Sequence, residues 1–363
     1  MRAILKTLLL IGCIAPPASL AFAQSTVPVI DGNATVRLPS VPIPFSELAT
    51  PEAKAAYLRL MEENRVAATK PARTIADQRA IEDAKLIPMK ERQMQALAVS
   101  IDPQVIAGVQ TDVITPKAGI APRNRNRVLI NLHGGGFTTG ARFGGQVESI
   151  PVAWAGRIKV VTVDYRMAPE HRFPAASEDV VAVYRELLKT YRAENIGIFG
   201  CSAGGMLTGQ TLAWFQTHGV PRPGAAGIFG SGSQIRGSGD SNYVAAPLMG
   251  WPMPPLPPGL NATQYMPYFR GANPNDPVLS PIEHPEILSK FPPTLIVSGT
   301  RDIGLSPSLN LHAKLVDAGA TAELHVWEAM THCGFTEPDV PESRQAWKVM
   351  AQFFDRYLGT KRK

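Results

Sequence analysis

A serine set among glycines is the first residue of this chain whose type and surroundings could do chemistry. The stretch GCSAG at residues 200–204 follows the apolar run IGIF and precedes a helix-forming sequence that begins near Gly205. In the pattern G-x-S-x-G, a sharp turn from strand to helix exposes the serine oxygen, and the glycines leave room for a strained backbone. The pattern alone is common, but its place between a strand and a helix predicts that Ser202 is a nucleophile.

A serine hydroxyl is a poor nucleophile at neutral pH and needs a neighbouring base. Among seven histidines, His332 in EAMTHCGF occupies a loop directly after the last predicted strand, which makes it the best candidate. Four other histidines suit structural or surface positions, on predicted helices, in a strand or in a loop: His218, His312, His325 and His284.

The acid that orients the base should follow another strand and lie between serine and histidine in chain order. Asp302 in LIVSGTRD meets both conditions. Asp276 is a weaker alternative because it follows no predicted strand. Glu328, which shares a strand end with His332, is an alternative only if Asp302 is misassigned.

A glycine run, LHGGGF at residues 132–137, follows the apolar run VLIN. Its flexible backbone can aim N–H groups at the negative oxygen of an attacked carbonyl, and each such donor lowers the barrier by roughly 3 kcal/mol. A phosphate-binding loop is disfavoured, because no Walker lysine follows and the fingerprint G-x-G-x-x-G is absent.

The elements that must position these residues alternate along the chain. Short β-rich runs (RVLINL, KVVTVDY, NIGIFG, AAGIFGS, PTLIVSG and AELHVW) are separated by helical stretches, and ESRQAWKVMAQFFDRYL closes the chain. This alternation predicts an α/β fold whose mainly parallel sheet carries helices on both faces, with ligands at the carboxyl ends of the strands. Residues 46–100 are helical in character, and residues 232–271, rich in proline, glycine and aromatics, are interpreted as part of a cap rather than a linker.

These pieces together resemble the bacterial hormone-sensitive-lipase branch of the α/β-hydrolases. The resemblance spans about residues 100–360 and rests on HGGGF at 133–137, VDYRMAPEHRFPAA at 163–176, GCSAG at 200–204, YFRGANPNDPVLSP at 268–281, GTRD at 299–302 and THCGF at 331–335. It implies an α/β-hydrolase fold with a mostly helical cap, formed by the helices of 46–100 and by residues 232–271. It also implies oxyanion N–H donors at Gly135, Gly136 and Ala203, and supporting roles for His133, Tyr165, Arg166, Pro169 and Glu170.

Two cysteines depart from the usual pattern of that family. Cys201 stands before the nucleophile, where Asp is frequent, and Cys333 follows the base, where a small residue is frequent. If Ser202 and His332 meet, these neighbours also come close, and an even pair in an exported protein favours a disulfide. Two separate buried thiols are the alternative. The order Cys-Ser, Asp, His-Cys is also similar to that of tannases and feruloyl esterases, in which the cysteines are bridged, so aromatic-acid esters join the expected substrates.

The first residues predict export. Arg2 and Lys6 precede an apolar run too short to span a bilayer, and Ala21-Phe22-Ala23 resembles a signal-peptidase site. Cleavage near Ala23 lowers the net charge from +6 to +4, and no nucleic-acid motif accompanies the basic residues. Lipoprotein processing at Cys13 is the less favoured alternative. The expected organisation is a signal peptide at 1–23, an N-terminal helical cap segment at 24–100 and a catalytic domain at 101–363 with a cap insertion at about 232–271.

The predicted activity is that of a secreted or periplasmic carboxylic ester hydrolase that uses Ser202, His332 and Asp302 and acts on short- to medium-chain or aromatic-acid esters. It requires no cofactor, and no zinc motif is present. The expected partner is a small, apolar ester, without nucleic acid or stable membrane insertion; a homodimer is left open. A lactone or amide hydrolase with the same triad is an alternative, and a non-catalytic binding protein on the same fold is a less favoured one.

Overall fold

The computed structural model describes residues 29–30, 32, 36–37, 42–69, 72, 74–236, 239–251, 257 and 259–360. The chain divides into two compact units, Met1–Phe45 and Ser46–Lys363. In the first unit, β1 (Val29–Ile30) pairs antiparallel with β2 (Val36–Arg37). The predicted signal peptide, with its cleavage site near Ala23 and the alternative site at Cys13, lies outside the described residues.

The second unit is built on an eight-stranded sheet in the order β10-β9-β8-β7-β5-β6-β4-β3. Its strands are β3 (Val99–Ile106), β4 (Val109–Pro116), β5 (Val128–Leu132), β6 (Lys159–Val163), β7 (Ile196–Cys201), β8 (Ala225–Phe229), β9 (Thr294–Arg301) and β10 (Ala322–Thr331). The strands from β5 to β10 pair in parallel, whereas β4 runs antiparallel to β6 and β3 antiparallel to β4. The predicted α/β class with a mainly parallel sheet is confirmed.

The hairpin β3–β4 is a difference from the sequence analysis, which predicted helical character up to about Ser100 and the first strand only near Arg127. The helical part ends at Ala96, and β3 begins at Val99. β3 is the edge strand of the sheet, and most of its residues are exposed or half-buried. Such a strand lacks the continuous apolar run that marks the buried strands, which is why the pattern did not reveal it.

Ten helices accompany the strands in the described part of the chain. They are α1 (Pro51–Ala68), α2 (Ile75–Ala96), α3 (Phe143–Gly156), α4 (Ala175–Leu187), α5 (Ala203–Thr217), α6 (Asp240–Leu248), α7 (Ala262–Tyr265), α8 (Pro285–Leu288), α9 (Leu305–Asp317) and α10 (Pro341–Tyr357). Short 3₁₀ turns lie at Pro122–Asn124, Ala193–Asn195, Pro267–Phe269, Pro281–Glu283 and Gly334–Thr336. None of the described helices is both long enough and apolar enough to cross a bilayer.

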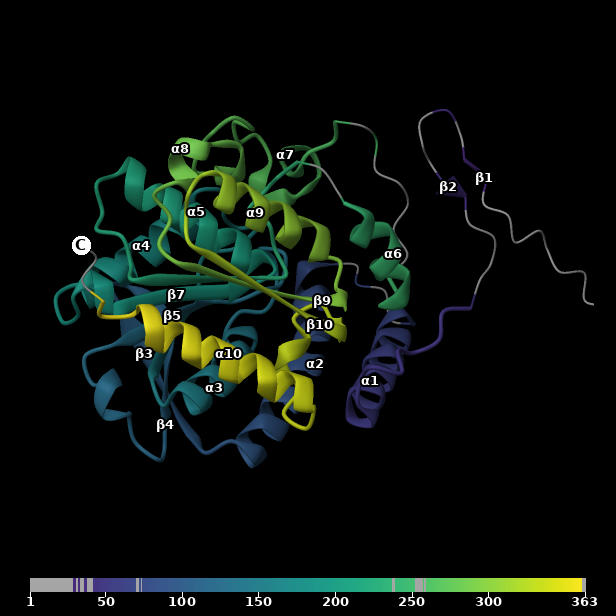
Figure 1. Cartoon of the computed structure of the whole chain (residues 1–363), viewed down its shortest axis with the longest axis horizontal. Coiled ribbons are helices and arrows are strands. Elements are labelled where there is room, and N and C mark those ends of the chain that lie inside the picture. The colour runs from purple at the N-terminus through teal and green to yellow at the C-terminus, as the bar shows by residue number, and fades with distance from the viewer. Residues whose placement is uncertain are drawn as a thin grey trace, which may run out of the picture. The chain divides into compact units, whose positions relative to one another are not determined.

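The core lies on both faces of the sheet, because neighbouring residues of a strand point to opposite sides. On β5, Leu129 packs with α3 and α10, whereas Ile130 packs with the cluster that contains α4, α5 and α9. Figure 1 shows α3 and α10 on one side of the sheet and α4, α5 and α9 on the other. With both faces covered, every residue of β5, β7 and β8 is buried.

The N-terminal helices contact the segment that was predicted to be a cap insertion. The Tyr57 hydroxyl of α1 donates to the Leu248 carbonyl at the end of α6 (2.6 Å), and the Asn64 side chain donates to the Met249 carbonyl (2.9 Å). Within residues 232–271, the structure describes α6, α7 and the turn Pro267–Phe269. Phe269 and Tyr268 are buried against Phe137, which follows the glycine run.

Candidate active site

Ser202 makes the turn between β7 and α5 by itself. β7 ends at Cys201, α5 begins at Ala203, and the Ser202 backbone has φ +57° and ψ −121°. A residue with a side chain adopts such a conformation at a cost of about 1–3 kcal/mol, and strained residues of this kind cluster at active sites. The Ser202 N–H donates to the Phe229 carbonyl of β8 (2.9 Å), which holds the turn in place.

The turn depends on a glycine at position 204. A β-carbon on Gly204 would overlap the carbonyl oxygen of Leu132, because the first turn of α5 lies directly against the end of β5. Ala203 is the first residue of α5, so its N–H is among those that a helix leaves without an intrahelical acceptor. The local sequence therefore places the Ser202 hydroxyl and the Ala203 N–H, which has no intrahelical acceptor, at the same strand end.

Asp302 and His332 follow neighbouring parallel strands, β9 and β10, and their side chains meet. Nδ1 of His332 lies 2.6 Å from Oδ1 of Asp302. The Asp302 carboxylate is 1% exposed and also accepts the Gly304 N–H (2.6 Å) and the Ser298 hydroxyl (2.8 Å). These contacts fix the carboxylate, so it can hold the imidazole in one orientation.

The electrostatics of this pair favour an imidazolium. Burial by itself lowers the pKa of His332, but the Asp302 charge, its hydrogen bond and the more distant Glu148 raise it above the usual histidine value. Burial raises the pKa of Asp302, but His332 and the hydrogen bonds to the carboxylate hold it below the usual range. The pair thus stabilises a proton on His332 while Asp302 stays ionised.

The glycine loop at residues 134–136 lies across from the serine turn. The Gly135 carbonyl accepts the N–H groups of Thr138 and Thr139 (both 3.0 Å), which closes the loop on itself. His133 precedes the loop, stacks on the Tyr165 ring with centroids 4.2 Å apart, and its carbonyl accepts the Tyr165 hydroxyl (2.7 Å). The loop is therefore fixed at both ends.

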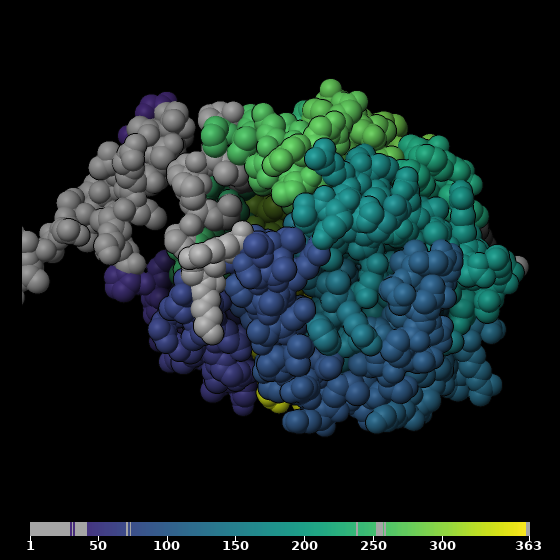
Figure 2. Space-filling model, turned by 180° about the vertical axis from the view of Figure 1, so that it is seen from behind, coloured from purple at the N-terminus to yellow at the C-terminus, as the bar shows by residue number. Residues whose placement is uncertain are grey.

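One cavity of about 440 Å³ brings most of these residues together. The loops at the strand ends contribute Gly134, Gly135, Gly136, Ser202, His332 and Cys333. Apolar side chains contribute much of the remaining wall, among them Tyr57 and Leu60 of α1, Leu86 and Met89 of α2, and Met249 and Trp251 after α6. Figure 2 shows the blue surface of α2 and the green surface of later residues on either side of a hollow.

The other residues singled out from the sequence do not join the contact between Asp302 and His332. Asp276 accepts the N–H of Val278 within its own loop (2.8 Å). Glu328 lines the cavity, but the carboxylate that contacts Nδ1 of His332 is that of Asp302. Arg166 pairs with Asp179 and Glu178, and Pro169 follows a cis peptide bond. Glu170 pairs with Arg79 of α2 (2.8 Å), whose guanidinium also donates to the Thr138 carbonyl beside the glycine loop.

The structure joins Cys201 and Cys333 by a disulfide, with their Cα atoms 6.1 Å apart. The two residues are separated by 132 positions in the sequence. Because Cys201 precedes Ser202 and Cys333 follows His332, the bond links the nucleophile turn directly to the loop that carries the histidine.

The sequence analysis did not single out Glu148, whose carboxylate is buried between the glycine loop and the serine turn. It lies on α3, a helix whose residues are mostly buried, and it is itself 5% exposed. A single charged residue inside an otherwise uncharged and largely apolar stretch, FGGQVESIPVAWAG, was the available indication, because a charged residue is almost never buried unless it is paired.

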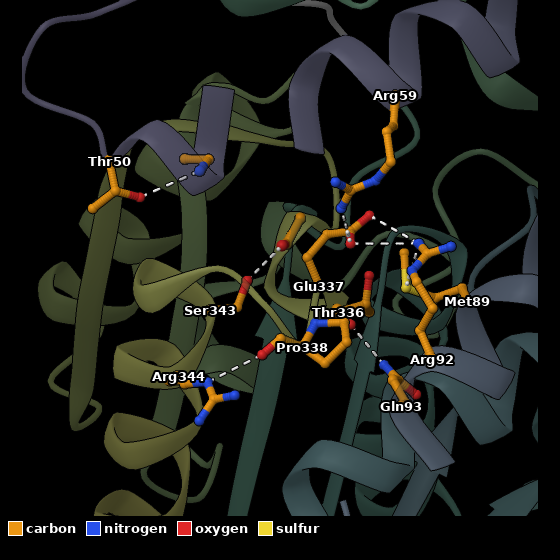
Figure 3. A network of polar contacts seen from close by, with 12 residues as sticks. Thr50, Arg59, Met89, Arg92, Gln93, Thr336, Glu337, Pro338, Ser343 and Arg344 are labelled. Carbon is orange, nitrogen blue, oxygen red and sulfur yellow. Dashed lines mark hydrogen bonds and ion pairs between the residues drawn. The ribbon is translucent and has the colours of Figure 1, made fainter. Parts of the chain in front are cut away.

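The contacts that attach the N-terminal helices to the histidine loop also have no signal in the sequence. Glu337, five residues after His332, forms ion pairs with Arg59 of α1 (3.0 Å) and Arg92 of α2 (3.4 Å), as Figure 3 shows. Gln93 donates to the Thr336 carbonyl (2.7 Å) and to the Val147 carbonyl of α3 (3.0 Å). The contacts with Glu337 and Thr336 join residues about 240 or more positions apart, and Gln93 and Val147 are 54 positions apart, so no local pattern reveals them.

In the residues that the structure describes, no group of three or more His, Cys, Asp or Glu side chains is arranged to hold a metal ion.

Comparison with known proteins identifies the family. A profile of the alpha/beta hydrolase fold matches residues 129–336, more than half of the chain. The chain belongs to the alpha/beta-hydrolase family. Its relatives include an acetyl-hydrolase of Streptomyces hygroscopicus, 29% identical over 65% of this chain and 78% of the relative, and an esterase of Acinetobacter venetianus, 25% identical over 70% and 82%.

Solved structures of alpha/beta-hydrolases resemble this one closely. The esterase E25 superposes with a TM-score of 0.76 at 28% identity, covering 89% of this chain and 98% of that protein. An esterase from the bacterial hormone-sensitive lipase (HSL) family gives a TM-score of 0.71 at 27% identity, covering 86% of this chain and all of that protein (100%). The predicted α/β-hydrolase fold is confirmed, and both of these similar structures are esterases.

Proposed function

We propose that this alpha/beta-hydrolase is a serine carboxylesterase in which Ser202, His332 and Asp302 form the catalytic triad. The observation that carries the proposal is the 2.6 Å contact between His332 Nδ1 and Asp302 Oδ1 beside a cavity that Ser202 also lines. A strained serine at a strand-to-helix turn, a histidine at a second strand end and a buried carboxylate at a third are the parts that acyl transfer needs.

In the proposed reaction, the Ser202 oxygen attacks the ester carbonyl while His332 Nε2 takes its proton. Asp302 keeps the imidazole in the tautomer whose Nε2 is free to accept, and its charge stabilises the imidazolium that forms. The negative oxygen of the tetrahedral intermediate is bound by the N–H groups of Gly135, Gly136 and Ala203. His332 then protonates the leaving alcohol.

Deacylation repeats these steps with water in place of the serine oxygen. His332 removes a proton from the water, the resulting hydroxide attacks the acyl-enzyme, and the Ser202 oxygen leaves with the proton that His332 returns. The acid is released and the starting state is restored. All the required groups belong to the chain, so the cycle proceeds without a cofactor.

We propose a small, apolar, uncharged ester as the substrate, of short to medium acyl chain or of an aromatic acid. A cavity of about 440 Å³ with apolar side chains from α1 and α2 suits such a molecule. The relatives support the ester class, since their names describe an acetyl-hydrolase, an esterase and a carboxylesterase/phospholipase.

Three further proposals complete this picture. The enzyme is exported after cleavage near Ala23, and Cys201 and Cys333 form their disulfide after export. The helices of residues 46–100 and about 232–271 act together as the cap over the active site, an arrangement supported by the contacts of Tyr57 and Asn64 with the end of α6. The enzyme acts as a monomer or a homodimer.

The test is kcat/KM of the purified protein lacking residues 1–23 on p-nitrophenyl esters from acetate to laurate, beside methyl ferulate and a gallate ester. Ser202→Ala is the control. Saturable hydrolysis that disappears in Ser202→Ala is the expected result. Hydrolysis that survives in Ser202→Ala, or none on any ester, contradicts the proposal. The acyl preference distinguishes the aliphatic from the aromatic class.

A further inference from the structure

Glu148 is a buried carboxylate that the triad does not use. Its Oε1 accepts the N–H of Gly134 (2.8 Å), and its Oε2 accepts the side-chain N–H of Asn131 (3.0 Å) and the N–H of Cys201 (3.2 Å). Every one of these partners is a donor. Both side-chain oxygens of Glu148 therefore have to act as acceptors, as they do in an ionised carboxylate.

Two of the three donors belong to the parts of the active site that have to be held at a fixed separation. Gly134 opens the glycine loop, and Cys201 immediately precedes Ser202. The two segments touch directly, because a β-carbon on Gly134 would lie 3.4 Å from the Ser202 β-carbon. Asn131, on β5, is in turn fixed by accepting the Thr162 hydroxyl (3.1 Å). The carboxylate thus bridges the loop and the turn from a helix that belongs to neither.

The same carboxylate acts electrostatically on the base. Burial raises the pKa of Glu148 to about 7, although its three hydrogen bonds and His332 lower it. The charge of Glu148 is among the causes that raise the pKa of His332. Burial raises the pKa of Tyr165, and the charge of Glu148 adds to this shift, while Glu82 and Lys85 of α2 are among the ionisable residues that line the same cavity as Glu148.

We propose that Glu148 is a positioning residue for the ester hydrolysis proposed above: its ionised carboxylate holds the Gly134 and Cys201 backbones together and so sets the distance from the oxyanion N–H groups to Ser202. It touches no reacting atom. When it is protonated, a donor stands where an acceptor is needed, the bridge weakens, and the oxyanion loop separates from the serine turn.

This role has a consequence for the pH dependence of the reaction. Activity requires His332 to be neutral and Glu148 to be ionised, so both groups contribute to the acid limb of kcat. Removing the Glu148 charge lowers the pKa of His332. Removing one of the donors to Glu148 raises the pKa of Glu148 itself.

The experiment measures kcat, KM and their pH profiles on p-nitrophenyl acetate for wild type, Glu148→Gln, Asn131→Ala and Asp112→Asn. Glutamine keeps the size of Glu148 but places an NH₂ group opposite one of the donors. Asp112 is the matched control. It is a buried carboxylate held by Gln146 of the same helix (2.6 Å), away from the glycine loop. Thermal unfolding of all four proteins reports stability separately.

For Glu148→Gln we expect kcat to fall at least about tenfold, with KM within about twofold of wild type, because misplacing reacting groups costs rate more than binding. The acid limb of its residual activity moves to lower pH. In Asn131→Ala the limb moves to higher pH. Asp112→Asn loses thermal stability but keeps the wild-type kcat and the wild-type profile.

Two outcomes overturn the inference while leaving the proposed function intact. One is an active wild type with a Glu148→Gln variant whose kcat and acid limb match those of Asp112→Asn. The other applies if Glu148→Gln does not fold. In that case, an Asn131→Ala variant whose acid limb lies at the same pH as that of wild type overturns the inference. A wild type that hydrolyses no ester, and whose Ser202 is not labelled by a fluorophosphonate, refutes the proposed function instead.

Discussion

Loss of the Cys201–Cys333 bond is expected to lower both the stability and the rate of this enzyme. The bond closes a loop with a sequence separation of 132 residues. For a loop of that length, the chain-entropy relation gives about 5 kcal/mol of stabilisation at 25 °C as an upper value. In a domain of this size, that free energy corresponds to a fall of about 7 °C in Tm.

The catalytic effect follows from the positions of the two cysteines. Cys201 and Cys333 are direct neighbours of Ser202 and His332, so the bond restrains the base relative to the nucleophile. The Asp302 contact and the Thr336 and Glu337 contacts hold the histidine loop without it. We therefore expect kcat to fall by about tenfold rather than to vanish.

The assay compares wild type with the double variant Cys201→Ala/Cys333→Ala, each with and without dithiothreitol. Tm and kcat of wild type should fall on reduction, whereas those of the double variant should not respond. Alkylation of the unfolded, unreduced protein, followed by mass spectrometry, should leave both wild-type cysteines unlabelled. Two labelled cysteines, or a wild type whose Tm is unchanged after complete reduction, would refute the reasoning.

Three further predictions concern the pair at the strand ends and the packing around it. In wild type, kcat/KM should rise with pH through a midpoint above 6.5, because His332 acts when neutral and its pKa is raised; a midpoint below 6.5 in a pH-rate profile contradicts this. Asp302→Asn should reduce kcat by about 10⁴ and move that midpoint to lower pH, which steady-state kinetics would detect. Gly204→Ala should destabilise the fold by about 3 kcal/mol, because its β-carbon overlaps the Leu132 carbonyl. A urea-unfolding midpoint equal to that of wild type would contradict this prediction.

Strands β5 to β9 and most of the helices followed from the sequence, since a strand covered on both faces is a continuous apolar run. Helix α3 did not. Its Gly144, Gly145 and Pro151 disfavour a helix in isolation, and the pattern gave no clear period. The fold requires the glycine, because a β-carbon on Gly145 would overlap the Thr162 hydroxyl of β6. Close packing of helix on sheet overrides the local preference.

The candidate nucleophile, base and acid could be named from sequence because each depends on a local rule, a residue type at the end of a strand. Ser202, Asp302 and His332 each follow the strand that the apolar pattern predicts, and parallel strands bring such ends to one edge. Their contacts with α1, α2 and α3 follow no such rule. Arg59 and Arg92 reach Glu337, and Glu148 reaches Gly134, only after the helices have packed.

The sequence by itself therefore determined the fold class and the residue types set at the strand ends, because strand periodicity and turn chemistry act over a few neighbouring residues. The tertiary structure alone decided that a carboxylate of α3 lies between the glycine loop and the serine turn, and that the N-terminal helices contact the histidine loop. Those contacts join positions distant in the chain, and they arise from the close packing of whole elements, which no local pattern encodes.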